Sequence, residues 1–195
     1  FELAGFVWFQ GFNDMVGRNV YPLVPSDHPT PRFANYTKWF ANFVRDVRKD
    51  LAAPSLPFVM CVMGVGGADA DAGNQAFRFS QAAISEIPEF RGNVLVVPTA
   101  PYWDEALAKL DRKRVDIRQK QYLLRTKNSN HENADGSMTP EDIQKFLTEF
   151  EKELFTAEDY ALEKRGKSNA GYHYLGSAKT YSLIGVAAAE ALLKH

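Results

Sequence analysis

Short runs of apolar residues recur through the first half of the chain, at residues 5–10, 58–63 and 94–97. Each run ends in a turn or loop segment rich in Gly, Pro or Asn. Continuous apolar runs of this length are typical of strands that are buried on both faces of a parallel sheet. The pattern therefore predicts three parallel strands over these ranges.

Helical periodicity separates the three predicted strands. Residues 33–51 carry apolar side chains at helical spacing, with charged and amide side chains on the opposite face. The apolar positions are Tyr36, Phe40, Phe43, Val44, Val47 and Leu51. A second helical pattern spans residues 74–87, so strands and helices alternate as in a sheet with right-handed crossovers. We predict an α/β fold, flavodoxin-like in outline, in which helices sandwich a parallel sheet.

The second half of the chain is charged and rich in helical patterns over residues 102–165. A polar loop is predicted inside this region, at residues 127–136. Thr139, followed by a proline and two acidic residues, has the features of a helix start. This region is expected to be a peripheral helical insertion.

The last apolar stretch, residues 178–194, predicts a final helix. Its Gly185 and a run of three alanines, 187–189, would let that helix lie close against the sheet. We therefore predict a single domain over residues 1–195 that contains a helical insertion at 103–166.

Composition and charge narrow the classes of function. The 195 residues are 45% hydrophobic and 24% charged, which is ordinary for one globular domain. A net charge of −1, with acids and bases intermixed, favours a neutral or sugar-like substrate over nucleic acid or an anionic membrane. No apolar stretch approaches the roughly 20 residues of a membrane span. The single cysteine, Cys61, lies in the second apolar run and is expected to be a buried hydrophobic residue.

The first candidate site follows the first predicted strand. Gly11, Asn13 and Asp14 form a Gly-x-Asn-Asp segment at its carboxyl end, the edge where open α/β sheets bind ligands. A side-chain amide there can donate a hydrogen bond to the oxyanion that forms when an ester carbonyl is attacked. The same residue types also build structural Asx turns, and this alternative stays open.

The second candidate site lies near the other end of the chain. His173 occupies a polar, glycine-punctuated segment, 168–176, just before the last predicted helix. A histidine in such a loop acts either as a general base or as a hydrogen-bonded structural residue. The other histidines, His28, His131 and His195, are expected to be surface residues.

Both segments resemble conserved blocks of one enzyme superfamily. Residues 8–14, Trp-Phe-Gln-Gly-Phe-Asn-Asp, resemble the third block of SGNH hydrolases, especially the Trp-x-Gln-Gly segment of sialate O-acetylesterase and acetylxylan esterase relatives. Residues 172–179, Tyr-His-Tyr-Leu-Gly-Ser-Ala-Lys, resemble their histidine block. The resemblance covers the C-terminal portion of such a domain and implies the SGNH hydrolase fold. It also implies that Asn13 and Gly11 belong to an oxyanion hole and that His173 activates a serine.

The sequence also departs from the pattern of these esterases. Their nucleophile lies in an early Gly-x-Ser motif, and no serine of this chain has that context. Because the chain opens almost directly into a predicted strand, we expect the serine in a missing N-terminal segment of the same protein. Ala170 stands where these relatives have an acid three residues before the histidine. Asp14, the carboxylate within the first motif, is the candidate for that orienting role.

Further residues are candidates for contacts with the substrate. Gly66 and Gly67 lie in a glycine-rich segment after the second predicted strand, and Asn74 follows them. The segment lacks the Lys-Ser/Thr of a phosphate loop and the glutamate of a calcium loop, so a loop that faces sugar hydroxyls is preferred. Trp103 is expected either to stack on a sugar ring or to pack in the core. The predicted substrate contacts also include Gln10 and Tyr172, which adjoin the two motifs.

The predicted function is removal of O-acetyl groups from carbohydrate through a serine–histidine acyl-enzyme, without a metal or organic cofactor. An inactive carbohydrate-binding or interaction module on the same scaffold is the alternative, and hydrolysis of lipid or aryl esters is a third. The expected partner is an acetylated carbohydrate. Carbohydrate-active relatives are often exported, which favours a periplasmic or extracellular location.

Overall fold

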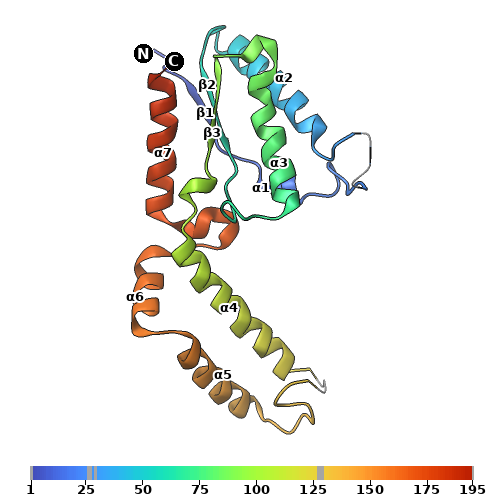
Figure 1. The fold of residues 1–195 in the computed structure, drawn as a ribbon, viewed down its shortest axis with the longest axis vertical. Helices are drawn as coiled ribbons and strands as arrows, with labels where there is room; N and C mark the ends of the chain where they lie inside the picture. Colours follow the sequence, from blue (N-terminus) through green and yellow to red (C-terminus); the bar gives the residue numbers. More distant parts are fainter. Residues whose placement is uncertain (1, 26–27, 29, 127–129, 195) are drawn as a thin grey trace. The chain divides into compact units, whose positions relative to one another are not determined.

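The computed structural model describes residues 2–25, 28, 30–126 and 130–194. It divides into two compact units, which we describe separately (Figure 1). The sheet unit comprises Phe1–Trp103 and Ala178–His195, and the helical unit comprises Asp104–Ser177. The helical unit begins close to the start of the predicted insertion, 103–166, and also contains the segment around His173. That the two units make one domain stays a prediction.

The sheet unit is built on three parallel strands. They are β1, Phe6–Trp8, β2, Phe58–Val62, and β3, Val94–Pro98. β2 lies between the other two, with Phe58 beside Phe6 on one side and beside Val94 on the other. All residues of β2 are buried, as expected for a central strand with both faces covered. The predicted α/β fold with a parallel sheet is confirmed.

Helices cover both faces of this sheet (Figure 1). α2, Ala34–Asp50, and α3, Ala72–Ala82, lie on one face, and α7, Ala178–Leu193, lies on the other. α2 and α3 are the connections between successive parallel strands, and right-handed crossovers in the same direction place such connections on one face. The sheet is therefore sandwiched by helices, as the alternating pattern predicted.

Five elements of the sheet unit end earlier than predicted: β1, α2, β2, α3 and α7. β1 covers only residues 6–8 of the predicted 5–10, because the chain leaves the sheet after Trp8. α3 gives way to a 3-10 turn, Ala83–Glu86, and a second such turn, Pro88–Phe90, begins with a proline that cannot continue the helix. Leu51, predicted in the apolar stripe of α2, is 46% exposed just beyond the end of that helix.

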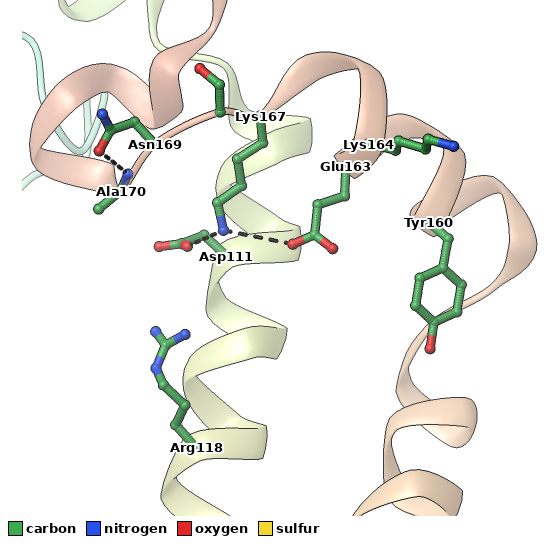
Figure 2. Close-up of a pocket in the computed structure, with 9 residues that line it drawn as sticks. Asp111, Arg118, Tyr160, Glu163, Lys164, Lys167, Asn169 and Ala170 are labelled. Carbon is green, nitrogen blue, oxygen red and sulfur yellow. Dashed lines mark hydrogen bonds and ion pairs between the residues drawn. The ribbon is translucent and has the colours of Figure 1, made fainter.

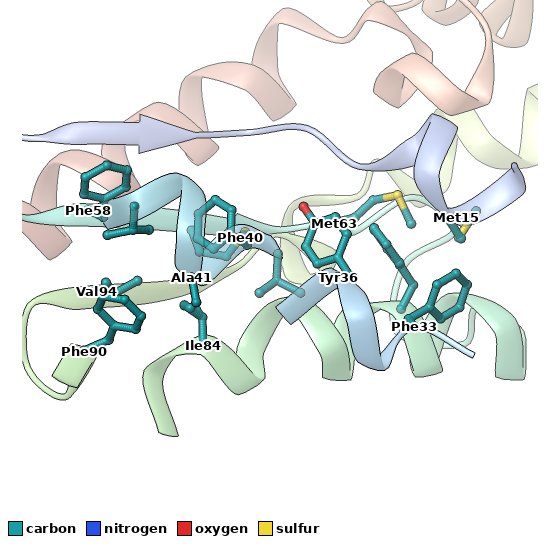
Figure 3. Close-up of a cluster of buried hydrophobic side chains, with 14 of the residues drawn as sticks. Met15, Phe33, Tyr36, Phe40, Ala41, Phe58, Met63, Ile84, Phe90 and Val94 are labelled. Carbon is teal, nitrogen blue, oxygen red and sulfur yellow. The ribbon is translucent and has the colours of Figure 1, made fainter. Parts of the chain in front are cut away.

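The main core of the sheet unit lies between the sheet and the α2 and α3 layer (Figure 3). Its large side chains include Phe33, Phe58, Phe77, Ile84 and Phe90, each at most 1% exposed. Burial of a side chain of this size stabilises the fold by about 1.5–3 kcal/mol. Phe77 of α3 contacts Tyr36 of α2 edge-to-face, with ring centroids 4.8 Å apart, so the two helices share one aromatic core.

α7 packs on the opposite face through one row of side chains. Thr180, Ile184 and Ala188, spaced four residues apart, are its buried positions. Gly185, predicted to allow close contact with the sheet, is exposed, and among the described residues nothing beyond its chain neighbours and its own helix backbone lies within 4 Å of the place of its missing Cβ. That prediction is wrong, because each helical residue is turned about 100° from its neighbour and Ile184 already faces the sheet. Of the predicted alanine run, only Ala188 is buried.

The described part of the helical unit contains three α-helices and a 3-10 segment. They are α4, Glu105–Leu124, α5, Pro140–Leu154, α6, Ala157–Gly166, and the 3-10 segment Gly171–Gly176. Thr139 caps α5 in a capping box with Asp142, which confirms the predicted helix start. Residues 130–136 of the predicted loop form turns, and residues 127–129 lie outside the described residues.

Partly buried ion pairs join the helices of this unit. Lys113 Nζ of α4 lies 2.5 Å from Asp159 Oδ2 of α6. Arg114 of α4 pairs with Glu163 of α6 at 2.6 Å and with Glu151 of α5 at 2.5 Å. Hydrogen bonds from Arg114 to these carboxylates raise its pKa and lower the pKa of Glu163. These ion pairs therefore link α4 to both α5 and α6.

Candidate functional site

The Gly-x-Asn-Asp segment forms a sharp corner at the carboxyl end of β1. Gly11 is buried there and has a φ of 151°, a conformation that favours glycine. A Cβ at this position would lie 2.6 Å from the ring of Phe77 and 2.8 Å from Gln81 Nε2. After the corner, Phe12–Val16 form the single turn of α1, a helix that the sequence pattern did not predict. Only glycine therefore fits this corner without displacing the core.

Asn13 and Asp14, both in this turn, differ in their exposure and in their hydrogen bonds. Asn13 is exposed, and its side-chain amide makes no hydrogen bond with any residue that the structure describes. Asp14 is partly buried, and its Oδ2 accepts a 2.7 Å hydrogen bond from Nε2 of Gln10. The amide of Asn13 is therefore available to a ligand, whereas Asp14 is held beside Gln10.

A buried glutamine holds the corner in place through hydrogen bonds, and the sequence pattern did not identify it as a functional residue. Gln81 of α3 is 0% exposed. Its Oε1 accepts a 2.8 Å hydrogen bond from the N–H of Met63, and its Nε2 donates a 3.0 Å hydrogen bond to the carbonyl oxygen of Gln10. The amide thus bridges the chain just beyond the ends of β1 and β2. The only signal in the sequence was an amide within the helical pattern between the second and third strands.

Replacing Gln81 with methionine is expected to destabilise the sheet unit. The variant keeps the side-chain length but leaves the N–H of Met63 and the carbonyl oxygen of Gln10 without their partner. We expect a loss of about 2–4 kcal/mol in the free energy of unfolding, measured by urea denaturation. The control is Gln75→Met, an exposed position on the same helix, which should change stability by less than about 1 kcal/mol. An unchanged stability for Gln81→Met would contradict this role.

An aromatic pocket adjoins the corner within the sheet unit. Its volume is about 410 Å³, and its walls are Gln10, Asp14 and six aromatic side chains: Trp8, Tyr21, Tyr36, Trp39, Phe40 and Phe43. Tyr21 and Tyr36 are buried, whereas Trp39 is 47% exposed. Burial and the negative charge of Asp14 raise the pKa of Tyr21 to about 12, so its hydroxyl stays protonated at neutral pH. From their helical spacing, Tyr36, Phe40 and Phe43 of α2 were predicted as core residues, and a pocket was not predicted.

The glycine-rich loop after β2 is held by Arg78 of α3. The guanidinium group, almost fully buried, donates hydrogen bonds of 2.7–2.9 Å to the carbonyl oxygens of Met63, Val65 and Gly67. Gly66 and Gly67 have φ values of 86° and 68°, and of the two only Gly66 is exposed. The loop is therefore anchored at three carbonyls, and Gly66 is the glycine that it presents to solvent.

Asn74 and Trp103 are the other predicted substrate contacts of the sheet unit. The backbone N–H of Asn74 donates a 2.8 Å hydrogen bond to Asp71 Oδ1 and, together with the Asn74 side chain, lowers the pKa of Asp71. The Oδ1 atom of Asn74 is buried without a hydrogen-bond partner among the described residues. Trp103 follows the 3-10 turn Ala100–Tyr102 and is partly buried. Asp71 thus caps α3 at the N–H of Asn74, and the substrate roles of Asn74 and Trp103 stay predictions.

In the helical unit, a strained backbone segment carries His173. Within Gly171–Gly176, Tyr174 and Leu175 have φ values of 51° and 60°, which cost of order 1–3 kcal/mol each for residues with a side chain. The backbone N–H groups of residues 168–169 donate to the carbonyl oxygen of Leu175 and close the segment. Burial of Tyr174 and Leu175 stabilises this conformation, and His173 between the glycine and these residues is exposed.

The four histidines differ in their surroundings. The ring of His173 lies against that of Tyr172, with centroids 4.5 Å apart. Nε2 of His131 lies 2.7 Å from the carbonyl oxygen of Thr126, Nδ1 accepts from the N–H of Asn133, and the side chain is partly buried. The expectation of a plain surface residue is therefore wrong for His131. His28 is exposed, as expected, and His195 lies outside the described residues.

A second pocket lies in the helical unit beside the histidine segment (Figure 2). Its volume is about 750 Å³, and it is lined by α4, α6 and residues 167–170. Lys167 Nζ lies 2.6 Å from Asp111 Oδ1 and 3.6 Å from Glu163 Oε1, so one cation pairs with two carboxylates. Arg118 also lines the pocket and has no ion-pair partner among the described residues. The ion pairs tie the chain leading to the histidine segment onto α4.

Cys61 and the metal-binding residue types offer no further site. Cys61 is 1% exposed, as predicted, and burial raises the pKa of its thiol to about 11, which disfavours a nucleophilic thiolate. Among the residues described, no group of three or more His, Cys, Asp or Glu side chains could hold a metal ion. None of the described helices combines the length and apolar character needed to cross a membrane.

The two predicted motifs thus lie in different units, each with its own local support. The sheet unit holds the Asn13 corner, the aromatic pocket and the glycine-rich loop, and the helical unit holds His173 and Tyr172. Comparison of the chain with protein-family models, curated proteins and solved structures found no match, so its function is argued from these residues alone.

Proposed function

We propose that this chain is part of a carbohydrate esterase that removes O-acetyl groups from sugars. The observation that carries the proposal is the corner after β1, where a glycine in a special conformation precedes the exposed, unbonded amide of Asn13. The corner follows the carboxyl end of a strand in a parallel sheet, the edge at which open α/β sheets bind ligands. A free amide donor at that edge suits an ester oxyanion.

In the proposed reaction, a serine from upstream of these residues attacks the acetyl carbonyl carbon, and His173 accepts the hydroxyl proton. The carbonyl oxygen becomes an oxyanion, to which Asn13 Nδ2 and the backbone N–H of Gly11 donate hydrogen bonds. His173 then returns the proton to the departing sugar oxygen, which leaves an acetyl-serine. Water attacks this ester with the same histidine as base, and acetate and free serine result. No step requires a metal or organic cofactor.

The exposed, strained histidine segment supports the role given to His173. Residues held in rare backbone conformations cluster at functional sites, and Tyr174 and Leu175 are two of them in succession. The orienting acid is left unassigned; Asp14 lies beside Gln10, whose Nε2 donates a hydrogen bond to Asp14 Oδ2. Ala170, at the position of the usual acid, has no carboxylate to offer.

An inactive carbohydrate-binding module is the second candidate, and two observations favour it. No serine of the chain lies in an early Gly-x-Ser motif, since the Gly-x-Ser at residues 166–168 lies near the C-terminal end. The aromatic pocket, with the Gln10 and Asp14 side chains at its wall, is a binding feature that needs no nucleophile. The two candidates differ in whether an activated serine exists in the complete protein.

A fluorophosphonate probe distinguishes the two candidates, because it labels an activated serine wherever that serine lies in the sequence. The complete natural protein would be treated with the probe, digested, and mapped by mass spectrometry. We expect one labelled serine on a peptide outside these residues, with labelling slowed by an acetylated saccharide. Heat-denatured protein is the control for nonspecific reaction. No label on protein that is folded by circular dichroism would overturn the esterase and favour the binding module.

A further inference from the structure

The aromatic pocket of the sheet unit leaves part of its aromatic lining exposed. Trp39 is about half exposed although its ring contacts Tyr21, with centroids 5.7 Å apart. Trp8, on β1, is partly buried and lies 4.7 Å from the ring of Phe43. The volume of about 410 Å³ is typical of small-molecule sites, which span ~300–1,000 Å³. We propose that this pocket binds one ring of a saccharide, with Trp39 and Trp8 as its stacking surfaces.

The polar wall of the pocket has the groups that sugar hydroxyls need. Gln10 Nε2 uses one N–H to donate to Asp14 Oδ2. Its second N–H, its own Oε1 and Asp14 Oδ1 make no hydrogen bond with the described residues. A ligand therefore meets a donor and two acceptors on two planar side chains, which suits neighbouring hydroxyl groups. The C–H face of the same ring would lie on the indole surfaces.

The Gln10–Asp14 pair also selects against other ligands of an aromatic pocket. A quaternary ammonium ion would gain from the rings and from the carboxylate, but it has no acceptor for the free N–H of Gln10. A fatty acyl chain would bury both polar side chains without partners, which is unfavourable by a few kcal/mol. A sugar ring is the ligand that satisfies the aromatic and the polar walls together.

The position of the pocket gives this site a role in substrate selection. Gln10 directly precedes Gly11 and Asp14 directly follows Asn13, so the polar wall and the proposed oxyanion donors share one short segment. A ring fixed by Gln10 and Asp14 would carry its O-acetyl group at that segment. The choice of a sugar as ligand rests on the proposed function, but binding at the pocket does not require turnover.

Calorimetric titration of the complete protein with xylotetraose and cellotetraose, neither of which carries an acetyl group, tests the site directly. We expect saturable binding of at least one of them and a loss of at least tenfold in affinity for Trp39→Ala. Trp39→Phe keeps an aromatic face and should lose less. Phe79→Ala is the matched control, because Phe79 is an aromatic residue of the same unit that is 75% exposed and lies outside the pocket. Thermal unfolding would confirm that each variant is folded.

The outcomes separate this inference from the proposed function. Equal affinity in wild type and Trp39→Ala, or absence of binding to both saccharides, would overturn the pocket assignment even if the protein hydrolyses acetyl esters. Binding of choline, but of neither saccharide, in a Trp39-dependent manner would assign the pocket to organic cations and overturn it as well. Trp39-dependent saccharide binding would support the pocket even if no activated serine is found.

Discussion

Replacing His173 with alanine in the complete protein is expected to lower kcat for hydrolysis of acetylated saccharide by about 10⁴-fold or more. Loss of a catalytic histidine removes the general base for the serine and the general acid for the leaving group, and the residual rate comes from the oxyanion hole and binding alone. Because His173 is exposed, its removal should barely change folding stability. Steady-state release of acetate at saturating substrate measures the effect.

The matched control for His173→Ala is His28→Ala. His28 is also an exposed histidine, and it lies in the sheet unit near Pro25 and Thr30, far in sequence from either motif. It should leave kcat within about threefold of the wild type. Turnover retained by a folded His173→Ala variant would rule out the serine–histidine mechanism with this residue as base.

Replacing Asn13 with alanine is expected to lower kcat by about 10²–10³-fold with little change in KM. Removing one oxyanion donor costs this much in comparable enzymes, because the hydrogen bond strengthens only as negative charge develops. The side chain of Asn13 has no hydrogen-bond partner among the described residues, so its loss should change the free energy of unfolding by less than about 0.5 kcal/mol. Acetate release and urea denaturation give the two measurements.

Asn35→Ala, at an exposed asparagine near the start of α2, is the control for the Asn13 variant. It should alter neither kcat nor stability appreciably. A rise in KM with unchanged kcat for Asn13→Ala would instead make Asn13 a ground-state substrate contact. A large loss of stability would make the amide structural, and either result would remove it from the oxyanion hole.

Local patterns predicted most elements of the fold. The continuous apolar run at residues 58–63 became the central strand β2, and Thr139 caps α5 as its context of proline and acids indicated. These features depend on residues close together in the chain. Helix and strand ends were less accurate, because they depend on distant partners. β1, for example, ends at Trp8, and two residues later the carbonyl oxygen of Gln10 is bound by Gln81, 71 positions away in the sequence.

Part of the candidate site could also be predicted from short stretches of the sequence. Gly11, Asn13 and His173 could be identified because each lies in a short motif that combines glycine with a chemically useful side chain. Such motifs are recognised from neighbouring residues alone. The side chains that hold the neighbouring loops in place could not be predicted from the sequence. Arg78 anchors the glycine-rich loop through carbonyl oxygens 11–15 positions away, and nothing in its own neighbourhood distinguishes it from an exposed helical arginine.

By itself, the sequence determined the alternation of buried strands and amphipathic helices, the caps, and the two motifs, because periodicity and residue chemistry act over a few residues. The tertiary structure decided which of Gly185 and Ile184 meets the sheet, and where Trp39 and Trp8 meet Gln10 and Asp14. These outcomes depend on how side chains far apart in sequence fill a common volume. Packing of that kind has no signature in any single stretch of the chain.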